Sequence, residues 1–204
     1  GAGKWGSLTY EVIDEGVRIT SCDPTATSVD IPVSIENLPV TKLGRSAFRH
    51  RVVLRAVSLP QTLLAIEDYA FYGCRLLETI SLPAKVETIG RFAFTMCTSL
   101  NSIAVDNRNE FFADREGILY TYDERRLMHV PHLKVLDDLV LPESLVSIGY
   151  SAFWECTNLT SITLPYSVRD IGMGAFGQCA SLASVTLGLN LETIGDGAFM
   201  SYSS

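Results

Sequence analysis

The chain has 204 residues, of which 47% are hydrophobic and 19% charged, and its net charge is −7. This hydrophobic content suits one domain with a sizeable core and excludes general disorder. The acidic balance argues against a nucleic-acid backbone or an anionic membrane as the main partner, because both require a basic face, and no apolar run is long enough to insert into a membrane.

The chain opens with GAGKWG, which contains neither a Met nor an apolar signal core. We interpret this as an interior piece or as a mature form whose signal peptide has been removed. Residues 8–39 follow as an N-terminal cap segment, and Cys22 is expected to be buried within it.

Two motifs then recur with a period of 23 residues. The dipeptide Ala-Phe ends at Phe48, Phe71, Phe94, Phe153, Phe176 and Phe199. The pattern L-x-x-[ILV]-x-L appears as LRAVSL, LETISL, LDDLVL, LTSITL and LASVTL. A unit this short cannot bury its own core, whereas stacked coils bury one together. The period therefore predicts a solenoid of about seven coils over residues 40–108 and 136–204.

Each repeat has a predictable internal layout. The L-x-x-I-x-L piece should be a strand, with Ile80 and Leu82 pointing inward and Thr79 and Ser81 outward. The Ala-Phe segment is expected to form a short helical or 3-10 turn whose Phe plugs the far side of the core. Glycine at positions 44, 90, 149, 172 and 195 is expected to permit a sharp bend.

One segment departs from the period. Between Leu100 and Leu136 the spacing is 36 residues, and the Ala-Phe motif is missing. Here GILYTY and RLMHVP flank Asp123–Arg126, an arrangement typical of a β-hairpin. We predict that residues 109–135 form an inserted hairpin that stands off the solenoid.

The combined repeat, [LV]-x-x-I-G-x-x-A-F-x-x-C-x-x-L-x-x-I-x-L-P, resembles the BspA-type leucine-rich repeat of bacterial cell-surface proteins. The resemblance covers roughly residues 8–199. The opening segment and the inserted hairpin also resemble segments found in this family. It implies a single domain over residues 1–204, a β-rich α/β solenoid wound as a right-handed superhelix. It also implies an extracellular or cell-surface location, with some relatives serving adhesion to host matrix or to other cells.

The cysteines show no pattern of catalysis or metal binding. Cys74, Cys97, Cys156 and Cys179 each lie three residues after a repeat Phe. Stacked side chains run parallel rather than facing each other, so we expect free, buried thiols. The segment HVPH lacks metal-ligand spacing. The adjacent acids Asp137–Asp138 and Asp123–Glu124 should point to opposite faces of a strand. We predict no enzymatic activity and no cofactor.

Three surfaces are candidate contact sites. The outward strand positions form a flat hydroxyl face that includes Thr79, Ser81, Ser102, Ser161, Thr163, Ser184 and Thr186. Solenoids present such faces to partners, although Ser and Thr are also ordinary solvent-facing strand residues, and this face lacks aromatic or Arg anchors. The hairpin carries Phe111, Phe112, Tyr120, Tyr122, Arg125 and Arg126, a composition enriched in interfaces. The third group is either a solvated face or a contact for a small anion or glycan, and it contains Arg45, Arg49, His50, Arg51 and Arg55.

These features favour a non-enzymatic, cell-surface or secreted binding module that mediates protein–protein or host-matrix adhesion. Its partner would be a protein or glycan at a cell surface or in the extracellular matrix. The alternative is a structural spacer with no ligand, which the hydroxyl face without anchors favours. The chain stops at FMSYSS, so residues 200–204 are expected either to cap the last coil or to leave an edge open to weak self-association.

Overall fold

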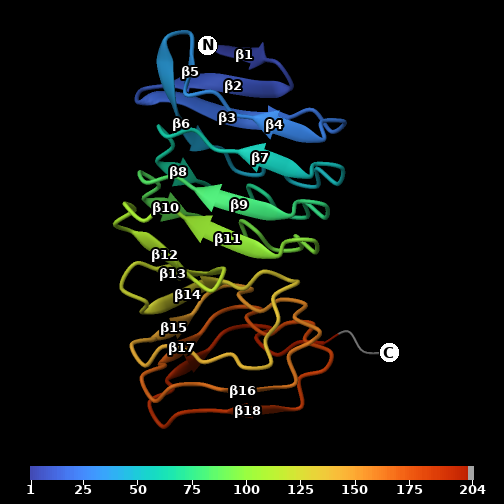
Figure 1. Cartoon of the computed structure of the whole chain (residues 1–204), viewed down its shortest axis with the longest axis vertical. Helices are drawn as coiled ribbons and strands as arrows, with labels where there is room; N and C mark the ends of the chain where they lie inside the picture. The colour runs from blue at the N-terminus through green and yellow to red at the C-terminus, as the bar shows by residue number, and fades with distance from the viewer. Residues whose placement is uncertain (202–204) are drawn as a thin grey trace.

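The computed structural model, which describes residues 1–201, is a β-solenoid of about eight turns of roughly 23 residues each. The turns stack into one column, with the N-terminal strands at one end and the last repeats at the other (Figure 1). The predicted solenoid is therefore confirmed. No helix occurs in the described part of the chain, and the Ala-Phe segments are plain turns rather than the helical or 3-10 turns that we predicted.

The first row of strands is the one that the L-x-x-I-x-L pattern predicted, and it faces the viewer in Figure 1. It consists of the parallel pairs β4 (Ser28–Asp30) with β7 (Ala56–Ser58), β9 (Thr79–Leu82) with β11 (Ser102–Val105), and β16 (Ser161–Thr163) with β18 (Ser184–Thr186). The side chains alternate as predicted, since Ile80 is buried whereas Thr79 and Ser81 are exposed. Residues 137–141 form no strand, so the row is interrupted between β11 and β16.

The second row is built from two larger sheets. The N-terminal sheet contains β1 (Ala2–Trp5), β2 (Leu8–Ile13), β3 (Gly16–Cys22), β6 (Leu38–Leu43), β8 (Ala65–Ile66) and β10 (Thr88–Ile89) in this order, with β5 (Ser34–Ile35) paired to β6. The C-terminal sheet contains β12 (Phe112–Arg115), β13 (Ile118–Thr121), β14 (Arg126–His129), β15 (Ser147–Ile148), β17 (Asp170–Ile171) and β19 (Thr193–Ile194). Strands β1, β2 and β3 pair antiparallel, β3, β6, β8 and β10 pair in parallel, and β5 pairs antiparallel with β6.

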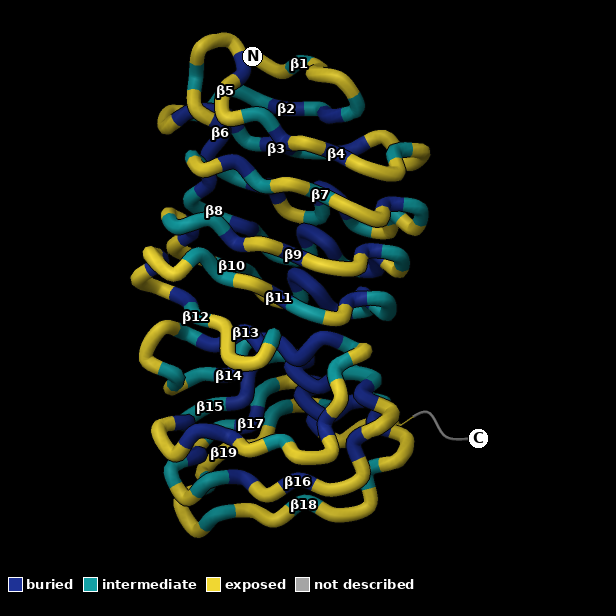
Figure 2. Tube along the Cα trace, in the orientation of Figure 1, coloured by how far each residue is buried: buried dark blue, intermediate teal, exposed yellow. Residues whose placement is uncertain are grey.

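Stacked aromatic rings run through the core inside the bends. Phe71 lies between Phe48 and Phe94, with ring centroids 5.0 and 5.7 Å away, and a second stack of the same kind begins at Phe153. Buried residues line the inside of the column and exposed residues its outside (Figure 2). The repeated Phe therefore joins each turn to its neighbours, as the sequence predicted.

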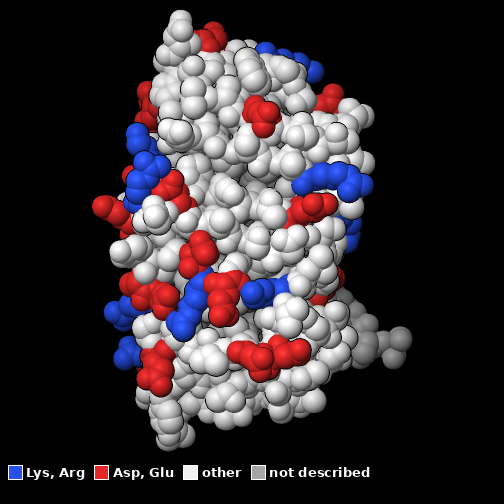
Figure 3. Space-filling model, viewed as in Figure 1, with Lys and Arg blue, Asp and Glu red and all other residues white. Residues whose placement is uncertain are grey.

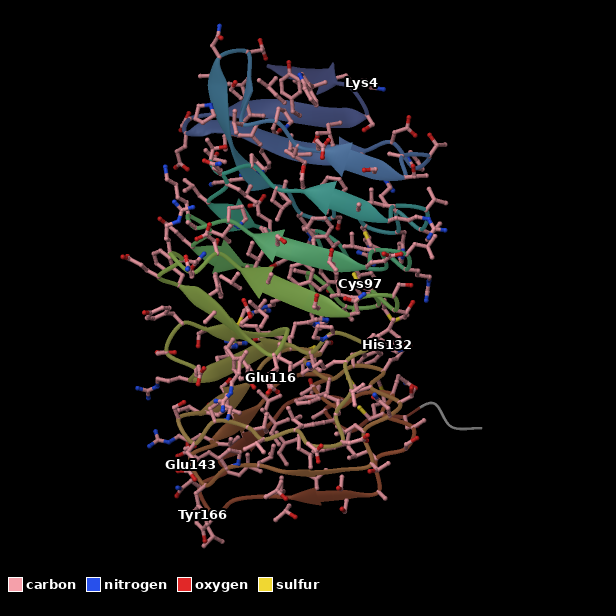
Figure 4. The ribbon with its side chains drawn as sticks, viewed as in Figure 1. Lys4, Cys97, Glu116, His132, Glu143 and Tyr166 are labelled. Carbon is pink, nitrogen blue, oxygen red and sulfur yellow. The ribbon has the colours of Figure 1, made fainter. Side chains whose placement is uncertain are left out.

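The cysteine thiols also link neighbouring turns. Cys74 donates its S–H to the carbonyl oxygen of Phe48 at 3.0 Å, and Cys97, labelled in Figure 4, donates to that of Phe71 at 3.2 Å. All five cysteines, Cys22 included, are buried and free, which confirms the prediction of unbridged thiols. A small buried donor at this position ties the bend to the preceding aromatic plug.

The bends reverse direction through left-handed residues on both sides of the plug. Around Phe71 these are Tyr69, with φ 59°, and Gly73, with φ 74°. A residue with positive φ cannot continue a helix, which is why the predicted helical turn does not form. Gly90 has a different role from the bend that we predicted, because its φ is not positive. A Cβ there would lie 2.4 Å from the backbone nitrogen of Asp68, so this glycine permits close approach of two turns.

The inserted segment is part of the column and does not stand off it. Strands β12, β13 and β14 form an antiparallel meander, and β14 then pairs in parallel with β15 as an ordinary repeat strand would. The prediction was wrong because β13 has apolar side chains on both faces. Leu119 packs into the N-terminal core cluster and Tyr120 into the C-terminal one, and each is at most 1% exposed. The insertion thus divides the core in two.

A break in backbone pairing, which we name the seam, lies between the turn of residues 88–97 and that of residues 126–133. In the regular bends, three N–H groups donate to carbonyl oxygens of the next turn at 2.7 to 3.0 Å. Phe92, Phe94 and Met96 hold these three positions at the seam and form no such bond across it. Strands β10 and β14 occupy equivalent positions in the turns on either side of the seam, but they belong to different sheets and do not pair with each other.

Side chains bridge the seam instead. The Trp154 indole Nε1 donates to Sδ of Met96 at 3.2 Å, and the rings of Phe94 and His129 lie 5.8 Å apart. His129 is 8% exposed. Burial, with a smaller contribution from the charge of His132, lowers the pKa of His129 to about 4.

The last coil remains open among the described residues. Ile194 is 52% exposed and Phe199 is 41% exposed. Residues 202–204 of the predicted cap lie outside the described part of the chain, and self-association through this end stays a prediction.

We expect Phe71→Ala to lower the free energy of unfolding by about 3–5 kcal/mol, because it removes a fully buried ring from between two others. The matched change Phe199→Ala should lower it by less than about half as much, since that ring is partly exposed. Urea denaturation followed by circular dichroism measures both. Equal losses would contradict the stacking account.

We also expect stability to fall as pH decreases from about 6.5 towards 4, by up to about 3 kcal/mol. The unfolded chain takes up a proton at the usual His pKa, whereas folded His129 resists protonation until its own lower pKa. Thermal midpoints between pH 7 and 5 should show this slope in the native chain and in His50→Asn, but not in His129→Gln. A slope that survives in His129→Gln would assign it to another group.

Candidate binding surfaces

The predicted hydroxyl face is present but divided. Most of its residues are exposed: Thr79, Ser81, Ser161, Thr163, Ser184 and Thr186. Ser102 is half-buried because Gly117 of the β12–β13 turn lies against it, so close that a Cβ on that glycine would be 3.3 Å from Cβ of Ser102. The two parts lie on either side of the insertion, where Figure 4 labels Glu116. The face seen in Figure 3 is largely uncharged, with scattered acidic and basic groups.

The predicted contact residues of β13 and of the turn that follows it divide between core and surface. Tyr120 is 1% exposed, and burial raises its pKa to about 12, so the prediction that it contacts a partner is wrong. The alternation along β13 turns this ring into the core. Tyr122 is 60% exposed and Arg125 is exposed at the β13–β14 turn, where the Asp123 carboxylate accepts the backbone N–H of Arg125.

The hairpin Phe residues also divide between surface and core. Phe111 is 46% exposed, whereas Phe112 is 6% exposed. Only the first of the two can reach a partner.

The predicted arginine cluster separates into structural and free members. The Arg51 guanidinium donates to the carbonyl oxygen of Cys22 and thereby ties the first bend to the cap segment. Arg55 lies 3.9 Å from the Glu78 carboxylate in an exposed ion pair. Arg45, Arg49 and His50 instead belong to a larger surface.

This larger surface, the Arg–aromatic ridge, crosses the bends of four turns. It contains Arg45, Arg49, His50, Tyr69, Tyr72, Arg91, Phe92, Arg126 and Tyr150. The Arg49 guanidinium carbon lies 4.9 Å from the ring centroids of both Tyr69 and Tyr72. Tyr69 stacks on Phe92 at 5.3 Å, and Phe92 lies 5.8 Å from Tyr150 across the seam. The aromatic rings therefore join both halves of the column.

The ridge arginines carry uncompensated charge. Within residues 1–201, Arg45, Arg49, Arg91 and Arg126 have no carboxylate oxygen within 4.0 Å, whereas arginines such as Arg18 form ion pairs. The guanidinium groups of Arg91 and Arg126 both lie over the Tyr150 ring, at 4.9 and 5.4 Å. A guanidinium held over a ring keeps its in-plane N–H donors free for a planar anion. Arg75, Arg125 and Arg169 also lack an ion pair in the described structure, so the ridge is set apart by its four guanidinium groups lying over aromatic rings on stacked turns.

A cleft of about 310 Å³, the seam cleft, opens where the ridge crosses the seam. Its lining includes Asp68, Arg91, Thr95, Arg126 and Tyr150. Thr95 is only 4% exposed, and its hydroxyl has no hydrogen-bond partner. The Nε of Arg126 is likewise buried without a partner. Buried polar groups normally have partners, so these two are exceptions that require an explanation.

Sequence reasoning found only part of the ridge. Of the ridge residues, the sequence predicted Arg45, Arg49, His50 and Arg126 as candidate contacts, but none of the aromatic rings. The sequence does contain one signal for the aromatic rings. Two consecutive repeats have an aromatic residue, Tyr69 or Phe92, at the second position after the repeat's glycine position, where a later repeat has Ser151. Tyr150 could not have been assigned to the same surface, because it comes from the other side of the insertion.

No three His, Cys, Asp or Glu side chains among residues 1–201 are placed to hold a metal ion. Burial raises the pKa of Cys179 to about 11, which leaves its thiol protonated at neutral pH and unreactive. No helix in that range is long and apolar enough to cross a membrane.

Comparisons with known proteins agree with the repeat pattern. The fold is similar to that of the pneumococcal vaccine antigen PcpA, with a TM-score of 0.72 and 16% identity over 94% of this chain and 71% of that chain. It is also similar to a leucine rich cell surface protein from Faecalibacterium prausnitzii (TM-score 0.62, 20% identity, 98% and 86% covered) and to a T. pallidum leucine rich repeat protein (0.53, 24%, 96% and 86%). No curated protein sequence matches the chain.

The sequence also matches the family described as BspA type Leucine rich repeat region, in six copies over residues 22–115 and 132–204. The unmatched residues 116–131 contain the β13–β14 hairpin, where the period of 23 is lost. The matched segments span most of the sequence, and the chain belongs to the BspA-type leucine-rich repeat family.

Proposed function

We propose that this chain is a non-enzymatic binding module that acts at a cell surface or outside the cell, with the Arg–aromatic ridge as its contact surface. Leucine-rich repeat solenoids of this kind are generally non-enzymatic. Two proteins of similar fold are, by their descriptions, a vaccine antigen and a cell surface protein, which supports an exposed location. The partner is a surface or matrix protein or a glycan, and the contact serves adhesion.

The observation that carries the proposal is the set of four ridge guanidinium groups without carboxylate partners. Core packing does not require Arg45 and Arg91, because both side chains are exposed. Tyr and Arg are the residues most enriched where binding energy concentrates. Their guanidinium groups are held on rings before a partner arrives, which lowers the entropy lost on binding.

The spacer alternative rests on a different observation. The hydroxyl face of the first strand row has no aromatic or Arg side chain among its outward positions, so it offers a partner few anchors. A column of stacked turns is also a stiff unit that could hold another domain away from a surface. Under this alternative, the ridge would only cover the bends.

The double variant Arg49→Gln/Arg91→Gln tests the proposal. We expect it to weaken binding to the partner by at least about 10-fold, because each charged hydrogen bond contributes about 1.5–3 kcal/mol. Its thermal midpoint should fall by only a few degrees, because neither guanidinium has an ion pair in the described structure and each lost cation–π contact contributes only about 0.5–1 kcal/mol. Biolayer interferometry on immobilised matrix proteins, together with a glycan array, measures the binding.

The matched control is Arg75→Gln/Arg169→Gln, which removes the same charge from exposed sites outside the ridge and should bind normally. Tyr122→Ser/Arg125→Gln tests the hairpin tip in the same assay. Loss of binding only in the tip variant would move the contact surface to the hairpin. A folded native chain that binds nothing would favour the spacer.

A further inference from the structure

We infer that the seam cleft binds the carboxylate or sulfate group of an acidic sugar residue, so that the ligand of the ridge is an acidic glycan. This rests on the proposed function, because it names the ligand class for the same surface. Four features of the cleft carry it: free backbone donors, a pair of guanidinium groups, an orphaned hydroxyl and a carboxylate placed for sugar hydroxyls.

The backbone donors come from the seam. The N–H groups of Phe92, Phe94 and Met96 hold positions that donate to the next turn in every regular bend, and at the seam they find no acceptor across it. In a regular bend, such as that of Tyr69, Phe71 and Gly73, the N–H groups at these alternate positions all point to the next turn. Phe92 and Phe94 also line the cleft. Successive backbone donors that face one hollow form a concavity suited to an anion.

Two arginines add charge to these donors. Arg91 approaches from the N-terminal half and Arg126 from the C-terminal half, and both lie over Tyr150. Neither has a carboxylate partner in the described structure. The buried hydroxyl of Thr95, without a partner of its own, supplies one further group in the lining. Charged hydrogen bonds to carboxylate or sulfate are the strongest that such a site can form.

Other features of the cleft favour a sugar over a bare anion or an acidic peptide. Asp68 is part of the lining, and its Oδ1 already accepts the backbone N–H of Arg91 at 2.8 Å. The remaining acceptor capacity of this carboxylate suits sugar hydroxyls, whereas its charge would repel an isolated anion. The half-buried side chains of Ile89 and Met128 give the lining apolar surface for a ring. A volume of about 310 Å³ is at the lower end of small-molecule sites and suits one substituted sugar unit.

The spacing of charge along the ridge suits a polymer. Arg49 and Arg91 lie on bends two turns apart, which is roughly 10 Å along the column at the spacing of neighbouring strands. A disaccharide unit is of similar length, so an acidic group on alternate sugars would meet one arginine after another. The cleft would then hold one acidic residue of the chain and the ridge its neighbours.

The experiment titrates the chain with defined probes. These are an oligogalacturonate, a heparin-derived hexasaccharide, a neutral chito-oligosaccharide, inorganic sulfate and a glutamate decapeptide. Calorimetry measures affinity, and nuclear magnetic resonance follows the amide protons. We expect one or both acidic oligosaccharides to bind and to shift the amides of Phe92 and Phe94, which line the cleft. The amides of Phe48 and Phe71 should not shift, because they are already bonded to the next turn.

The variants separate the cleft from the rest of the surface. Arg91→Gln/Arg126→Gln should weaken binding of the acidic oligosaccharide at least 10-fold, while Arg75→Gln/Arg169→Gln should change it less than 2-fold. Binding should also weaken as salt rises, because the attraction is between charges. Should the cleft variant fail to fold, the amide shifts in the native chain still decide the question.

Several outcomes would overturn the inference. Equal binding of the neutral oligosaccharide would remove the role of charge, equal binding of the decapeptide would indicate an acidic protein partner, and binding of sulfate alone would reduce the cleft to an ion site. Matrix-protein binding that depends on Arg49 and Arg91 without any glycan binding would sink the inference and keep the proposed function. A chain that binds no probe and no matrix protein would remove both.

Discussion

Every regular turn of this solenoid depends on contact with the turn before it and the turn after it. A segment of roughly 23 residues cannot bury its own apolar side chains, so its Phe packs between the Phe rings of its neighbours. The same neighbours supply acceptors for three backbone N–H groups in each regular bend and for the Cys thiol. Stacking thus satisfies the apolar and the polar needs of a turn together.

This dependence explains why one irregular turn has such a large effect. The inserted meander restores the core through Leu119 on one face of β13 and Tyr120 on the other. It does not restore the backbone acceptors that the bend of Phe92, Phe94 and Met96 would have met in a regular neighbour. Apolar packing tolerates a change of register, because it has no direction, whereas a hydrogen bond requires donor and acceptor to be aligned. At the seam, apolar packing is therefore maintained while the backbone hydrogen bonds are lost.

The ridge and the seam cleft both follow from this geometry. Bends stacked in register bring side chains from separate repeats, such as Tyr69 and Phe92, into contact along the column. At the seam the rings continue to Tyr150, although the backbone bonding does not. The molecule therefore presents free donors and unpaired guanidinium groups at the one place in the described bends where its repetition fails.

The sequence by itself determined the repeat unit, the alternation of Ile80 with Thr79 and Ser81, the Phe plugs and the buried free cysteines, because all of these follow from spacing along one chain and from the burial of apolar side chains. Only the tertiary structure decided that the hairpin joins the column, that Tyr120 is core rather than contact, and that Arg91 and Arg126 meet over one ring. These outcomes depend on the register between turns separated by an irregular insertion. A periodic pattern carries no information about that register, since the pattern stops where the insertion begins.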